Sequence, residues 1–158
     1  MKNVTTTIYL VISGLILLVI GGTILLEPHL FHGSNGIALG NDPNLLSEIR
    51  APGGLLACSG ITILMGAFRN QMRPLAATLS ILVYGSFGMS RLVSMGLDGI
   101  PSSSIVGAAA VEVTVAIFGV YILWRARSMR LHAASSSRSG SEPRSGKSAF
   151  SRGSASRR

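Results

Sequence analysis

Residues 8–26 read IYLVISGLILLVIGGTILL, nineteen consecutive residues without a charge. A helix of this length covers about 28 Å, close to the hydrocarbon thickness of a bilayer. Lys2 supplies a basic start of the kind found in signal peptides. However, the apolar run is long for a signal peptide, and no small-residue cleavage site precedes Glu27. The segment therefore predicts a retained transmembrane helix.

Three more apolar segments follow, at about 51–68, 75–97 and 103–124. The connections between the four segments are too short for a separate soluble domain. The last 27 residues, 132–158, are rich in Ser, Arg and Gly, and they lack the apolar residues needed to offset chain entropy. We therefore predict an all-α integral membrane four-helix bundle in residues 1–131 and a disordered cytoplasmic tail in residues 132–158.

Composition supports a membrane protein and argues against a nucleic-acid-binding one. Charged residues make up 13% of the chain, about half the usual share in a soluble domain. The net charge of +8 comes mainly from Arg125, Arg127, Arg130 and the tail, next to an apolar span. The expected partner is thus the lipid bilayer. Anionic lipid headgroups are a second possible partner of the tail, although we favour a solvated tail with no dedicated role.

The basic residues also predict an orientation. In a four-span arrangement, Lys2, Arg69, Arg73 and the arginines at 125–130 fall on one side. The other side holds Glu27, Asp42, Glu48 and Asp98, with Arg50 as its one basic residue. Because basic loops face the cytoplasm, both termini are predicted to be cytoplasmic. The sequence leaves a homo-oligomer open, and the single cysteine, Cys58, excludes an internal disulfide.

Two charges lie inside the predicted spans, where a charge is costly and marks a functional or structural site. Glu112 lies about 14 Å into the fourth span, and small residues at helical spacing (Ala108, Ala109, Ala116, Gly119) share its face. Arg91 lies about 9 Å inside the outer end of the third span. A short turn joins these spans, so Arg91 and Glu112 come within reach of each other. A structural ion pair and a ligand or proton site are both open interpretations.

A third candidate region is DPNLLSEIRAPGG at residues 42–54. Asp42 suits a helix N-cap and Pro43 the first helical position. Pro52 is expected to kink this helix, with Gly53 and Gly54 permitting close packing or further distortion. Arg50 is predicted to point inward on a stripe of small residues. The candidate ligand site or buried ion-pair cluster, in the outer half of the bundle, is Glu48, Arg50, Arg91, Asp98 and Glu112.

Other chemistry is poorly supported. Glu27, His29 and His32 could be metal ligands, but the one further histidine lies at the far end of the chain, and a zinc site normally needs three or four protein ligands. We therefore interpret them as an interfacial loop with incidental histidines. There is no phosphate-binding loop, nucleophile elbow or paired-cysteine motif. We therefore expect no metal and no cofactor, and the sequence identifies no catalytic residue.

The chain resembles a bacterial membrane family filed as domain of unknown function 4345. The resemblance rests on LLSEIRAPGG at 45–54, GAFR at 66–69, RLVS at 91–94 with Asp98, Gly99 and Pro101, and Glu112. It covers about residues 8–124 and leaves out the tail. It implies a small four-helix protein of the bacterial inner membrane, loosely similar to the DoxX-like group, and it brings no reaction, cofactor or catalytic residue.

Three functional hypotheses follow. The first is a non-enzymatic protein that binds a small ligand or partner in a polar pocket open toward the outer face, with Arg50 and Arg91 as anion or counter-charge sites and Glu112 as an acceptor. The second is a membrane enzyme or proton-coupled carrier in which Glu112 exchanges a proton. The third is a purely structural membrane protein.

Overall fold

The computed structural model describes residues 4–139, and this part of the chain is all-α, with no strand. Its elements are, in chain order, α1 (Val4–Leu26), α2 (Pro28–Ser34), α3 (Pro43–Phe68), the short 3-10 helix η1 (Asn70–Met72), α4 (Arg73–Asp98) and α5 (Ser103–Ser139). Four helices in the described range are long and apolar enough to cross a membrane, which confirms the predicted fold class.

Two helices, α3 and α5, extend beyond their predicted spans by two turns or more. Helix α3 begins at Pro43, eight residues before the apolar span predicted from residue 51. The predicted N-cap is confirmed, because the Asp42 carboxylate accepts a hydrogen bond from the Asn44 nitrogen at 2.9 Å. Helix α5 continues to Ser139, so residues 132–139, predicted to be disordered, are helical. Extending an existing helix avoids the cost of nucleation, and Ala133 and Ala134 in this stretch are good helix formers. Residues 140–158, the rest of the predicted tail, lie outside the described residues.

The chain divides into two compact units, Met1–Ala126 and Arg127–Arg158. The first unit contains α1 to α4 and the part of α5 that forms the fourth candidate span. The second begins within α5, in the basic stretch that follows the span.

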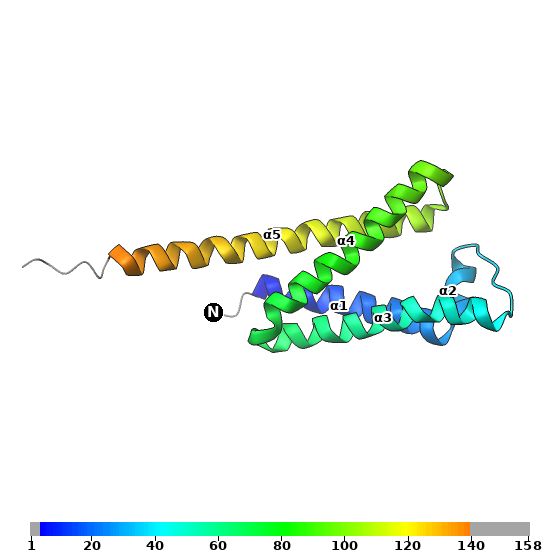
Figure 1. The fold of residues 1–158 in the computed structure, drawn as a ribbon, viewed down its shortest axis with the longest axis horizontal. Coiled ribbons are helices and arrows are strands. Elements are labelled where there is room, and N and C mark those ends of the chain that lie inside the picture. Colours follow the sequence, from blue (N-terminus) through cyan, green and yellow to red (C-terminus); the bar gives the residue numbers. More distant parts are fainter. Residues whose placement is uncertain (1–3, 140–158) are drawn as a thin grey trace, which may run out of the picture. The chain divides into compact units, whose positions relative to one another are not determined.

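Helices α1 and α3 run side by side (Figure 1) and meet through four glycines. Gly14 faces Gly60, and Gly21 faces Gly53, and the two glycines of each helix are seven positions apart. A Cβ atom on Gly60 would lie 2.6 Å from the Leu18 nitrogen and 2.7 Å from the Gly14 carbonyl oxygen. The two backbones therefore approach as closely as the small-residue interfaces of membrane helices allow.

The expected kink at Pro52 remains a prediction. Helix α3 is continuous through this proline. The next residue, Gly53, is helical and packs against α1. A Cβ atom there would lie 2.8 Å from Cγ2 of Ile24 and 2.9 Å from the Leu25 nitrogen. Of the two roles predicted for Gly53, close packing or further distortion, the structure shows close packing.

A layer of buried hydroxyl groups joins α1 to α4 and α5. The Tyr9 and Ser80 hydroxyls are hydrogen-bonded at 2.8 Å, and the Tyr9 hydroxyl also donates to the Val115 carbonyl oxygen at 3.3 Å. The Tyr84 hydroxyl donates to the Ser13 carbonyl oxygen at 2.7 Å. Because lipid offers no hydrogen bonds, such groups must find partners inside the protein. The layer therefore fixes how α4 and α5 lie against α1.

Candidate functional site

An ion pair joins α4 and α5 inside their apolar spans. The Nε atom of Arg91 donates to both carboxylate oxygens of Glu112, at 3.0 and 3.2 Å. The two side chains keep 30% and 14% of their surface exposed, respectively. Gly88, one helical turn before Arg91, lets the helices approach: a Cβ atom there would lie 3.0 Å from Cγ2 of Val113 and 3.4 Å from Cβ of Glu112.

The ion pair lines a cavity of about 350 Å³. Its walls come from α1, α2, α3, α4 and α5 and are mainly apolar. Residues that contribute include Ile16, Ile20, Phe31, Val83, Phe87, Ala108 and Val111. Its polar lining consists of Ser34, Asn35, Tyr84, Arg91 and Glu112. The volume is within the range of small-molecule sites, and an apolar wall with a few polar groups is their usual composition.

Helix α2 forms one side of this cavity, and the sequence interpretation missed it. Phe31, Ser34 and Asn35 reach the cavity from this helix and its C-terminal end. Asn35 donates to the Phe31 carbonyl oxygen at 3.0 Å and accepts from the Ser104 hydroxyl at 3.0 Å, which ties α2 to the start of α5. Pro28 at the first helical position was an available signal, because proline is favoured there.

The Arg91 guanidinium uses only one of its nitrogen atoms in hydrogen bonds to described residues. Arg91 contacts Glu112 through Nε, and its two Nη atoms make no hydrogen bond to any described residue. A guanidinium carries five N–H donors, so four remain for a bound oxygen acceptor. Because Glu112 already balances the charge of Arg91, a second full negative charge would have no counter-charge at this site. The arrangement favours an uncharged acceptor such as a carbonyl or hydroxyl oxygen.

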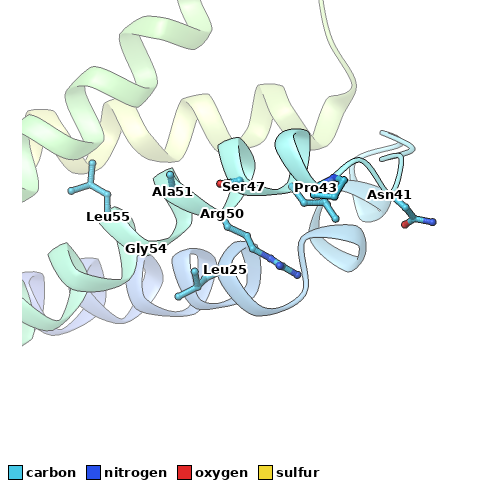
Figure 2. A pocket seen from close by; sticks show the side chains of 9 residues that line it. Leu25, Asn41, Pro43, Ser47, Arg50, Ala51, Gly54 and Leu55 are labelled. Atoms are coloured by element: carbon cyan, nitrogen blue, oxygen red, sulfur yellow. The ribbon is translucent and has the colours of Figure 1, made fainter.

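The other three candidate site residues do not join the ion pair. Asp98 is exposed and accepts from the Ser94 hydroxyl at 2.9 Å, and Glu48 is exposed on α3. Arg50 is also exposed and lines a different, open cavity of about 620 Å³ with Leu25, Ser47 and Gly54 (Figure 2). Of the five candidate residues, the fold brings Arg91 and Glu112 into contact, and Glu48, Arg50 and Asp98 lie apart from them.

The inward orientation predicted for Arg50 is wrong, for a geometric reason. The side of α3 that faces its neighbours includes Ile63, Gly60, Leu56 and Gly53, in steps of three and four residues. Continued toward the N-terminus, these steps reach the half-buried Ile49. Arg50 lies one residue further along, rotated by about 100° on the helix surface, so it leaves this face.

No metal site emerges among residues 4–139, where no three His, Cys, Asp or Glu side chains gather closely enough to hold an ion. A ring nitrogen of His32 is hydrogen-bonded to the Pro28 carbonyl oxygen at 3.0 Å, within α2. That contact gives this histidine a local structural role.

Comparison with known proteins gives one match. The model of a family described as a domain of unknown function, number 4345, matches residues 5–124. This range covers the four candidate spans except for Val4 and the last two residues of the fourth span, and it includes both members of the ion pair. Searches of curated proteins and of solved structures found no significant match.

Proposed function

The chain belongs to the family of domain of unknown function 4345, and from this premise we propose that it is a multi-pass membrane protein that binds a small amphipathic molecule. The cavity beside Arg91 and Glu112 is the proposed site. The observation that carries the proposal is the pairing of free guanidinium donors with an apolar wall. An apolar body would lie against Ile16, Ile20 and Phe87, and an oxygen acceptor would meet Arg91.

The membrane setting supports this ligand class. Apolar molecules concentrate in the bilayer and can enter a site between helices from the side. The hydrocarbon region of the bilayer offers no hydrogen-bond donor. A ligand with an oxygen acceptor would therefore gain a hydrogen bond by moving from lipid to Arg91, and a purely apolar molecule would not. In this proposal Glu112 acts on Arg91: it neutralises the guanidinium and holds its Nε edge, so that the Nη edge stays available.

A matched pair of substitutions on α5 tests the proposal. Ala108→Phe fills part of the cavity, whereas Ala110→Phe adds the same side chain at an exposed position outside the cavity lining. We expect native mass spectrometry of gently extracted protein to show a small molecule retained by the wild type and by Ala110→Phe, and lost from Ala108→Phe. Equal retention by the two variants, or no retained molecule in the wild type, would contradict a resident ligand in this cavity.

The rival function is proton exchange at Glu112. It is favoured by the layer of hydroxyl groups, because Tyr84 lines the cavity while Tyr9 lines a second cavity of about 280 Å³. Proton-coupled transport should depend on pH in the wild type and lose that dependence in Glu112→Gln. Under the ligand-binding proposal, the same substitution changes binding at every pH to a similar degree.

We further propose the bacterial inner membrane as the location, with both termini in the cytoplasm. The support is the basic stretch at Arg125, Arg127 and Arg130, together with Arg69 just after α3 and Arg73 at the start of α4. A reporter that is active only in the cytoplasm should give signal when fused after Asn70 or Arg130. It should be silent after Gly40 or Gly99. The reverse pattern would invert the orientation.

A further inference from the structure

The open cavity at the N-terminal end of α3 combines a free cation with apolar side chains. Arg50 has no hydrogen bond or ion pair to any described residue. Asn41 and Ser47 add polar groups to the lining, while Leu25, Leu46 and Leu55 supply apolar surface. Figure 2 shows the Arg50 side chain extending from α3 toward the end of α1 that carries Leu25.

The level of this cavity relative to the spans follows from the α1–α3 contact. Gly53 packs against Ile24 and Leu25, which belong to the last turn of the apolar α1 helix. Arg50 lies three residues before Gly53, about 4.5 Å further toward the membrane surface. With the apolar end of α1 taken as the edge of the hydrocarbon layer, the guanidinium lies at the level where lipid headgroups begin, and Leu55 lies at the depth of the acyl chains.

From this arrangement we propose that the cavity lined by Arg50 binds the phosphate of a phospholipid. The guanidinium would donate to the phosphate oxygens, Ser47 or Asn41 would add a hydrogen bond, and the first part of an acyl chain would lie along Leu25 and Leu55. The nearby acid Glu48 forms no ion pair with Arg50 in the structure, so the positive charge is available. This site is separate from the Arg91–Glu112 cavity and does not depend on the function proposed for it.

Thermal unfolding of delipidated protein in detergent tests the proposal, with phosphatidylglycerol as the probe. Two further additives separate the parts of the ligand: a diacylglycerol with the same acyl chains, and inorganic phosphate. We expect phosphatidylglycerol to raise the unfolding midpoint of the wild type. Arg50→Gln should need about 10- to 100-fold more lipid for the same rise, because it loses a charge-assisted hydrogen bond. Arg50→Lys should retain much of the effect.

The matched control is Arg69→Gln, which removes an exposed arginine at the opposite end of α3. It should respond to the lipid as the wild type does. The proposal is overturned if Arg50→Gln responds like the wild type, or if Arg69→Gln weakens the response equally. An equal rise with diacylglycerol would show that the phosphate is not recognised. An equal rise with inorganic phosphate would show a free-anion site in place of a lipid site.

Discussion

The α1–α3 interface and the part of the α4–α5 interface around Arg91 and Glu112 both contain small residues, but the two contacts differ in character. Between α1 and α3, glycines on both helices let the two backbones come close together, as where Gly60 packs against the Gly14 carbonyl oxygen. Between α4 and α5, Gly88 faces Val113 and the Cβ of Glu112. One helical turn after Gly88, the ion pair of Arg91 with Glu112 lines a cavity. Glycines on both helices close the α1–α3 interface, whereas at Gly88 the α5 partner presents larger side chains and a cavity remains beside the ion pair.

This difference implies that the two interfaces contribute differently to stability and to ligand binding. The close α1–α3 contact has no space to rearrange, because neither backbone can move without separating the helices. The α4–α5 contact depends on long side chains that have other rotamers available. We therefore expect stability to depend most on the first interface and ligand binding to depend on the second.

The largest effect is expected at the α1–α3 interface. In Gly21→Ala, the new methyl group would meet the Gly53 carbonyl oxygen at 2.7 Å and Cβ of Leu56 at 2.8 Å. We expect the free energy of unfolding to fall by about 2–3 kcal/mol, measured by denaturant titration in detergent. The control is the adjacent Gly22→Ala, where nothing lies within 4 Å. It should stabilise slightly, because alanine is the better helix former. Similar losses for the two variants would refute the close contact.

A smaller effect is expected from the ion pair. Breaking a fully buried pair costs about 3–5 kcal/mol, but Arg91 keeps part of its surface exposed. We therefore expect Arg91→Met and Glu112→Gln each to lower the unfolding free energy by about 2 kcal/mol. The double variant should recover a large part of the summed loss, since neither charge is then left alone. Strictly additive losses would show that the two side chains do not interact in the folded protein.

The smallest effect is expected where the two regions are joined. Tyr84→Phe removes the hydroxyl that donates to the Ser13 carbonyl oxygen and keeps the ring. We expect a loss of about 1 kcal/mol in unfolding free energy, the usual net value of a single hydrogen bond. Tyr121→Phe is the control, because this tyrosine is exposed on α5. A cost for Tyr121→Phe as large as that for Tyr84→Phe would argue against the buried hydroxyl layer.

Much of the fold could be predicted from the sequence because a membrane span is a property of one segment. Residues 8–26 are long and apolar enough to cross a bilayer whatever surrounds them, and the observed helix α1 extends them by one turn at the start. The α3 N-cap at Asp42 follows from the same kind of local chemistry. The small residues around Glu112 likewise indicated that this carboxyl faces other helices, and it contacts Arg91.

The tertiary structure decided the features that depend on how one helix is rotated against another. Arg50 and Gly53 are three residues apart, yet one lines an open cavity and the other packs against α1. The cavity beside Arg91 exists because α2 returns over the bundle and brings Phe31 and Asn35 to it. Hydropathy and charge are summed along a single segment, so the sequence alone determines them. Helix rotation is fixed by the partner's side chains, and only the folded chain specifies those contacts.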